Sequence, residues 1–204
     1  GTITVPQLLL IDTRFLETLP QNEMRSGLAE MLKHGLIYDK IYWEQFLDLT
    51  TLNFNDLDIL IYRSIEIKNA IVKQDPTENG IRKALNFGHT LGHAIESHFL
   101  NTEKQLLHGE AIAIGMILES YLSKEKGLLT NEEYQEIKRT ISDIFDAFEF
   151  SANDIIAIQN LLIHDKKNEH GKVQFALLDG IGKCTINQSV DKDLIINSFE
   201  DYKI

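Results

Sequence analysis

The sequence predicts a mainly α-helical, multi-helix domain with a small β-hairpin late in the chain. Over most of the chain, apolar residues recur at steps of three and four, which is the period of an amphipathic helix. After residue 171 the period changes, because KVQFALL and KCTINQS alternate or carry β-branched side chains around the turn sequence DGIG. At 204 residues, without repeats or low-complexity stretches, we expect one domain over residues 1–204.

The first elements are expected before Pro76. LLLID at 8–12 predicts a short strand that turns into FLETL. A helix is expected to begin at Asn22 and to break near Asp39, after which the helical pattern continues through IYWEQFLDL. Asp56 is a candidate N-cap of the next helix, and DPTENG after that helix is expected to form a loop.

Further helices are expected in the rest of the chain. Thr130 and Glu133 fit a capping box, in which each side chain bonds the backbone N–H of the other residue at a helix start. The expected helices cover 84–100, 109–126, 131–147, 153–163 and the closing segment DKDLIINSFEDY.

Charge and composition exclude several classes of function. The net charge of -11 argues against a broad nucleic-acid surface and against attraction to anionic lipid. The longest apolar run, AIAIGMIL, is far shorter than the ~20 residues that span a bilayer, and no signal-peptide pattern is present. We therefore expect a cytoplasmic protein without membrane or nucleic-acid partners. The single cysteine, Cys184, excludes an internal disulfide and a thiolate-rich cluster, which leaves nitrogen and oxygen ligands for any metal.

Three histidines lie in LNFGHTLGHAIESHFLNTEKQLLHGEAIAIGM, residues 85–116. His89 and His93 stand four apart and so share one helix face, and His108 lies where the next helix should begin. Three convergent imidazoles would suit zinc or iron. Histidines four apart are also common in ordinary helices, so spacing alone leaves metal binding and plain helix packing about equally open. The other histidines are interpreted as surface or supporting groups: His34, His98, His164 and His170.

Glycines and a carboxylate favour a site. Gly88 and Gly92 lie inside an expected helix, where glycine costs ~1 kcal/mol relative to alanine, which indicates a close approach to the backbone. Glu30 lies on the apolar side of its helix in RSGLAEMLKHG, where a carboxylate is costly unless it is paired or bound to metal. The alternative is an exposed ion pair with Lys33, three residues later.

A group of cations lies directly upstream of the histidines, in KNAIVKQDPTENGIRKALNFGH. Together these side chains could bind phosphate or carboxylate groups, although each alone would more often be a solvated helix charge. The cations are Lys68, Lys73, Arg82 and Lys83.

The motifs together resemble those of the 3-dehydroquinate synthase family, specifically its C-terminal, metal-binding domain. The matching stretches are IDTRFLETLP, RSGLAEMLKHGLI, KNAIVKQDPTENGIRKALNFGHTLGHAIES, LLHGEAIAIGM and HDKKNEHGKVQFALLDGIGK. Five blocks in the family's order and spacing are far more specific than one pair of histidines. The resemblance implies the multi-helix fold of that domain.

The resemblance also implies a site. Its zinc ligands are Glu30, His89 and His108, with a position left open for substrate oxygens and water. It places His93 beside the metal, for hydrogen bonding to substrate or proton transfer. Lys33 and Lys68 are implied to supply positive charge where negative charge develops in the reaction. The implied substrate ligands are Lys33, Lys68, Arg82, Asn86 and one of Lys167 and Lys166, with Lys167 preferred. The residues implied to contact the nicotinamide dinucleotide are Phe15, Leu16, Glu17 and Thr18.

The implied reaction is that of a carbon–oxygen lyase in the shikimate pathway, which leads to chorismate and the aromatic amino acids. It converts 3-deoxy-D-arabino-heptulosonate 7-phosphate, a phosphorylated sugar acid, to 3-dehydroquinate and phosphate. NAD and Zn²⁺ or Co²⁺ are the implied cofactors, and a homodimer is the implied assembly. The family's N-terminal nucleotide-binding half has no counterpart before Pro6, so we expect an isolated domain that binds metal weakly and does not turn over substrate alone.

Other functions remain open. A related cyclase acting on glucose 6-phosphate shares much of the pattern, whereas a polyol or iron-dependent alcohol dehydrogenase would not need the cations around the DPTENG loop. A noncatalytic helical module would have no reason to keep the metal ligands and the cations together.

Overall fold

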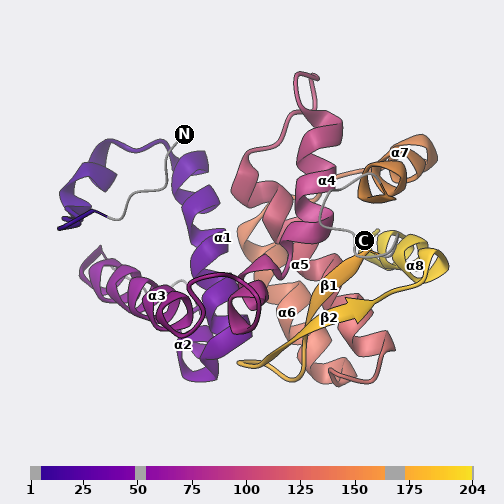
Figure 1. Cartoon of the computed structure of the whole chain (residues 1–204). Coiled ribbons are helices and arrows are strands. Elements are labelled where there is room, and N and C mark those ends of the chain that lie inside the picture. Colours follow the sequence, from indigo (N-terminus) through magenta and orange to yellow (C-terminus); the bar gives the residue numbers. More distant parts are fainter. Residues whose placement is uncertain (1–5, 49–53, 164–172, 204) are drawn as a thin grey trace.

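The computed structural model describes residues 6–48, 54–163 and 173–203, and it shows the mainly helical fold that the sequence predicts (Figure 1). Within these ranges, none of the helices has the length and apolar composition of a membrane span. The elements, in chain order, are η1 (Thr13–Thr18), α1 (Gln21–Tyr38), α2 (Lys40–Glu44), α3 (Phe54–Gln74), η3 (Ile81–Asn86), α4 (His89–Phe99), α5 (His108–Glu125), α6 (Asn131–Ile144), α7 (Ala152–Ile163), β1 (Gln174–Leu178), β2 (Cys184–Ser189) and α8 (Lys192–Tyr202).

Helix α5 forms the centre of the fold and contacts α1, α4, α6, α8 and β1. Nearly all of its residues from Gly109 to Ser123 are buried. A helix that is apolar or small on every side is stable only when other elements cover it. Figure 1 shows this arrangement, with α1 on one side of α5 and α8 on the other.

Capping side chains set helix boundaries close to where the sequence predicts them. Asp39 ends α1, and its Oδ1 accepts the N–H of Tyr42 at 3.1 Å in the first turn of α2. Thr130 and Glu133 form the predicted capping box of α6. The prediction that Asp56 caps α3 is wrong, because this helix begins at Phe54 and Asp56 lies within its first turn.

The late hairpin is confirmed. Strands β1 and β2 pair antiparallel, with Leu178 opposite Cys184. The N–H of Asp179 donates to the carbonyl of Lys183 at 2.9 Å and closes the turn. Cys184 packs against the core and burial raises the pKa of its thiol to about 12, which fits a packing role.

Two predictions about secondary structure are wrong. Residues 8–12 form no strand, and the side chains of 8–11 are all more than half exposed, because no strand lies beside them in the described residues. Residues 84–100 are not one helix either. The 3₁₀-helix η3 ends at Asn86, and Gly88 has φ +76° before α4 begins. That left-handed φ is open to glycine and interrupts the helix.

Candidate active site

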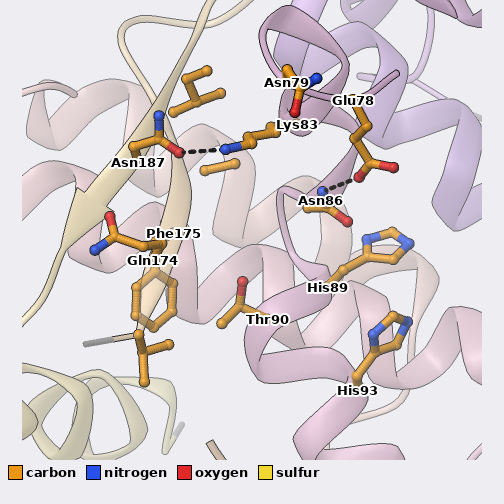
Figure 2. Close-up of a pocket in the computed structure, with 13 residues that line it drawn as sticks. Glu78, Asn79, Lys83, Asn86, His89, Thr90, His93, Gln174, Phe175 and Asn187 are labelled. Atoms are coloured by element: carbon orange, nitrogen blue, oxygen red, sulfur yellow. Dashed lines mark hydrogen bonds between the residues drawn. The ribbon is translucent and has the colours of Figure 1, made fainter. Parts of the chain in front are cut away.

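Three histidine rings come together at the N-terminal ends of α4 and α5. His89 and His93 occupy the first two turns of α4, and His108 is the first residue of α5. The ring centroids of His89 and His93 are 5.1 Å apart, and each lies 5.6 Å from that of His108. One ligand atom from each ring lies within 4.8 Å of the others. Figure 2 shows His89 and His93 on the same side of α4. This arrangement suits shared ligation of one metal ion.

Helix α1 reaches the histidines through a close contact between Ser26 and Gly109. The Oγ of Ser26 accepts the N–H of Gly109 at 2.9 Å. A Cβ atom on Gly109 would lie 2.1 Å from the backbone oxygen of Ser26, so only glycine permits this approach of α1 to α5. Glu30, one turn after Ser26, lies beside His89, with its Oε1 3.2 Å from the Nε2 of the ring.

The surroundings of His89 fit a cation between its ring and Glu30. The Nδ1 of His89 lies 3.1 Å from the backbone oxygen of Phe87. That oxygen can only accept, so Nδ1 carries a proton, and in the neutral form of the ring Nε2 then presents a lone pair. The lone pair faces a carboxylate oxygen of Glu30 at 3.2 Å, and two acceptors at this distance repel unless a proton or a metal ion lies between them.

His108 has a matching arrangement. Its Nδ1 lies 3.1 Å from Oε2 of Glu96 on α4. A carboxylate bound to one ring nitrogen leaves the other for a metal and raises its basicity. Glu96 is not among the residues that the sequence predicts for the site. Its only signal was its position three residues after His93, which places the two side chains on one helix face.

Lys33 is buried, which contradicts the alternative of an exposed ion pair with Glu30. Its side chain is 3% exposed and its Nζ donates to Oε2 of Glu30 at 2.7 Å. Burial lowers the pKa of Lys33, and Glu30 offsets this only in part. Burial raises the pKa of Glu30, but the contacts with His89 and Lys33 outweigh it and hold that pKa well below its usual range. Glu30 is therefore a carboxylate at neutral pH, and Lys33 releases its proton more readily than a surface lysine.

His34 is not a surface group, because its exposed fraction is 3%. Its Nδ1 lies 2.7 Å from Oγ of Ser64. Burial, followed by the charge of Lys33, lowers the pKa of His34 to about 4, so its ring is neutral. His34 lines a mostly apolar cavity of about 360 Å³, and Glu30 and Lys68 line the same cavity. This places Lys68 near the metal-ligand candidates.

A second cavity, of about 390 Å³, lies between η3, α4 and the hairpin (Figure 2). His89 and His93 line it on the α4 side, and Phe175 and Asn187 of the hairpin line the opposite wall. Lys83 spans the gap, because its Nζ donates to Oδ1 of Asn187 at 3.2 Å. The cavity joins the histidines to a space of the size of a small ligand, with a lining that is part polar and part apolar.

Two expected substrate ligands, Asn86 and Arg82, meet the carboxylate of Glu78 at this cavity. The Nδ2 of Asn86 donates to Oε1 of Glu78 at 2.9 Å, and the Nε of Arg82 lies 3.9 Å from Oε2. Asp75 shapes the loop, since its Oδ2 accepts the N–H of Arg82 at 3.1 Å. Glu78 was missed in the sequence analysis, because a carboxylate in DPTENG carries no specific signal. It lines the cavity beside Asn86.

The other predicted residues lie outside the group of three histidines or outside the described residues. Phe15 to Thr18 lie in η1, where Phe15 is 77% exposed and Leu16 lines the apolar cavity. His98 pairs with Asp154 of α7 at 2.8 Å. Four predicted residues lie outside the described residues: His164, Lys166, Lys167 and His170.

Comparison with known sequences gives a consistent result. The family described as 3-dehydroquinate synthase C-terminal matches residues 27–168. A 3-dehydroquinate synthase from Parabacteroides distasonis is 40% identical over 205 residues, which cover 100% of this chain and 58% of that protein. Another, from Thermodesulfovibrio yellowstonii, is 42% identical over 193 residues and covers 92% and 53%. The chain thus spans little more than half the length of these relatives.

Solved structures share the fold. A 2-epi-5-epi-valiolone synthase from Streptomyces hygroscopicus subsp. jinggangensis 5008, with NAD+ and Zn²⁺ bound, matches with a TM-score of 0.75 and 25% identity, over 94% of this chain and 54% of that one. A 2-deoxy-scyllo-inosose synthase complexed with carbaglucose-6-phosphate, NAD+ and Co²⁺ matches with a TM-score of 0.74 and 25% identity, over 93% and 54%. These neighbours confirm the fold class predicted from the sequence.

Proposed function

Because the chain belongs to the 3-dehydroquinate synthase family, we propose that it forms the metal- and substrate-binding part of an enzyme that converts 3-deoxy-D-arabino-heptulosonate 7-phosphate to 3-dehydroquinate and phosphate. One observation carries the proposal. The carboxylate of Glu30 lies 3.2 Å from Nε2 of His89, beside two further imidazoles. A carboxylate and a ring nitrogen at this distance hold a proton or a metal ion between them, and the two further imidazoles favour the metal ion. The homodimer and the cytoplasmic location stay predictions.

Glu30, His89 and His108 would hold the metal ion in this proposal, and His93 lies beside them. When bound, Zn²⁺ or Co²⁺ supplies a Lewis acid and NAD supplies a hydride acceptor. Both kinds of cofactor are bound in the structural neighbours. Residues 15–18 of η1 remain the proposed contact with the dinucleotide.

Two residues of the chain can hold and move protons next to a bound sugar acid. Lys33 donates to Glu30 at 2.7 Å and, because burial lowers its pKa, gives up its proton more readily than a surface lysine. The carboxylate of Glu78 lines the cavity and can accept a proton from a substrate carbon or hydroxyl. His93 lines the same cavity and is proposed to bond substrate oxygens.

Arg82 and Asn86 are proposed to bind the anionic groups of the substrate. Arginine presents a planar fork that matches carboxylate and phosphate oxygens. In the structure both residues contact Glu78, at 3.9 and 2.9 Å. An anionic substrate would compete with Glu78 for these contacts and so free its carboxylate for proton transfer. Lys68, together with Lys167 or Lys166, is proposed to add positive charge.

A related sugar-phosphate cyclase is a second candidate, because both structural neighbours described above are cyclic-polyol synthases. Sequence identity of 40% to a 3-dehydroquinate synthase, against 25% to these neighbours, favours the first candidate. The two functions differ in substrate, since a heptulosonate carries a carboxylate that glucose 6-phosphate lacks.

The test has two parts. Bound zinc is measured in the purified chain, in His89→Ala and in a control, His98→Ala, which changes a histidine of the same helix that pairs with Asp154. With zinc supplied in excess, we expect about one zinc per chain in the wild type and control and a loss in His89→Ala. Equal zinc in all three would remove the metal site and favour a noncatalytic module.

The second part measures phosphate release in a protein that joins this chain to a dinucleotide-binding domain. Faster release from 3-deoxy-D-arabino-heptulosonate 7-phosphate than from glucose 6-phosphate supports the proposal. The reverse preference would replace it with the cyclase.

A further inference from the structure

Glu119 is a buried carboxylate in α5 that takes no part in the proposed chemistry. Its exposed fraction is 0%. Its Oε2 accepts the N–H of Gly88 at 2.7 Å, and its Oε1 accepts the N–H of Leu91 at 3.0 Å. Burial raises the pKa of Glu119, and the hydrogen bonds from the N–H groups of Leu91 and Gly88 oppose this rise. The net pKa is about 8. Both oxygens of this buried carboxyl group are therefore hydrogen-bonded to the start of α4.

The two N–H groups flank His89 at the start of α4. A helix leaves its first N–H groups without partners inside the helix, and a side chain at the N-cap usually accepts one of them. Here the N-cap is Gly88, which has no side chain to do so. Glu119 takes this role from the neighbouring helix.

A continuous path of contacts leads from Glu119 to the His89 ring. Glu119 binds the N–H of the peptide group between Phe87 and Gly88, and the carbonyl of that same peptide group binds Nδ1 of His89 at 3.1 Å. Hydrogen bonds in series polarise one another, so a carboxylate at one end strengthens the bond at the other. A stronger bond at Nδ1 fixes the ring and makes Nε2 more basic.

We propose that Glu119 is a positioning residue of the metal centre, which orients the His89 imidazole through the Phe87–Gly88 peptide group. The proposal rests on the proposed function, because it requires that Nε2 of His89 bind a metal ion. Glu119 also lies on the helix that begins with His108. It therefore joins the helices that carry two of the ligands.

The test replaces Glu119 by glutamine. Glu119→Gln keeps the size of the side chain but has one acceptor oxygen and a donor NH₂ group, so one backbone N–H must face a donor. The control is Ser123→Ala, one turn later on α5. The Oγ of Ser123 is buried, donates to the carbonyl of Glu119 at 2.7 Å and accepts the N–H of Leu178 at 3.1 Å, so this change removes buried hydrogen bonds without touching α4.

The readout is Co²⁺ binding to the purified chain, followed by visible absorption at about pH 8, close to the pKa of Glu119. Folding is checked by circular dichroism. We expect Glu119→Gln to weaken Co²⁺ binding about 10- to 100-fold and to change the absorption bands, as loss of an outer-shell partner does. Ser123→Ala should stay within about twofold of the wild type even if it melts earlier.

A second measurement covers the case in which Glu119→Gln does not fold. In the wild-type chain, Zn²⁺ should slow hydrogen exchange at the Gly88 and Leu91 amides, because coupling between two parts of a site is reciprocal. If folded Glu119→Gln binds Co²⁺ like the wild type, or if bound Zn²⁺ leaves both amides unchanged, Glu119 has only a structural role. If the wild type binds neither Co²⁺ nor Zn²⁺, the proposed metal site itself is wrong. Failure of the proposed function can therefore be told apart from failure of the role proposed for Glu119.

Discussion

The contact between Ser26 and Gly109 makes the strongest single prediction, because α1 meets α5 there without room for one methyl group. A Cβ atom on Gly109 would lie 2.1 Å from a backbone oxygen of Ser26, whereas Cβ atoms essentially never approach another heavy atom closer than 3.0 Å. Gly109→Ala therefore has to push the helices apart by about 1 Å, since the obstacle is backbone and cannot rotate away. Gly27→Ala is the matched control, because nothing lies within 4 Å of a Cβ on Gly27 in α1.

The expected energies have opposite signs. Overpacking of this kind costs about 1–3 kcal/mol, and the better helix preference of alanine returns at most about 1 kcal/mol. From the middle of that range, Gly109→Ala should be less stable by about 1 kcal/mol or more. Gly27→Ala should be more stable by about 0.5–1 kcal/mol, because only the helix preference remains. Urea unfolding of the metal-free chains gives both free energies.

Gly109→Ala should also weaken Co²⁺ binding at least tenfold, because the same contact places Glu30 beside His89. Gly27→Ala should bind like the wild type. If Gly109→Ala is as stable as Gly27→Ala, the two helices do not approach as closely as described, and the placement of Glu30 loses its support.

Three further predictions follow from individual side chains. Burial lowers the pKa of His34 from 6.5 to about 4, so the unfolded chain binds the proton at a higher pH than the folded chain, and the free energy of unfolding falls by about 3 kcal/mol as pH drops from 6.5 to 4. Urea unfolding of metal-free His34→Gln at several pH values should lack this part of the pH dependence, and an unchanged dependence would contradict the assignment. Glu78→Gln keeps its bond from Asn86 but loses the proton acceptor, so phosphate release should slow at least about 100-fold while Co²⁺ affinity stays within about twofold; an unchanged rate would exclude Glu78 as a base. Zn²⁺ at about a hundredfold excess over its dissociation constant should raise the free energy of unfolding by about 2.7 kcal/mol in the wild type and not in His89→Ala; an equal rise in both would place the ion elsewhere.

The parts of the fold that the sequence predicts well depend on local chemistry. Asp39 and Thr130 cap helices with their own side chains and nearby backbone, so the signal lies within a few residues. The hairpin depends on a change of period around a glycine-containing turn. The strand at 8–12 was predicted from apolar residues alone, and it fails because a strand needs a partner that the local sequence cannot supply.

The parts of the site that the sequence analysis missed depend on contacts across the fold. Glu96 acts through His108, twelve residues later, and Glu78 acts through the folding of its loop against Asn86. The burial of His34 depends on its bond to Ser64 in another helix. None of these contacts produces a periodic pattern in the sequence, so they can be identified only from the folded structure.

The histidine pair on α4 shows why spacing alone could not decide the ligand set. A helix brings His89 and His93 to one face whatever their use, but their surroundings differ in chemistry. Nδ1 of His89 bonds a carbonyl whose peptide group is held by Glu119, and its Nε2 meets Glu30 at 3.2 Å. A ring whose proton is fixed on one nitrogen, with the other nitrogen aimed at a carboxylate, is prepared for a cation before any cation arrives. Helix α5 contributes to this arrangement twice, because it begins with His108 and also carries Glu119, the carboxylate proposed to orient the His89 ring.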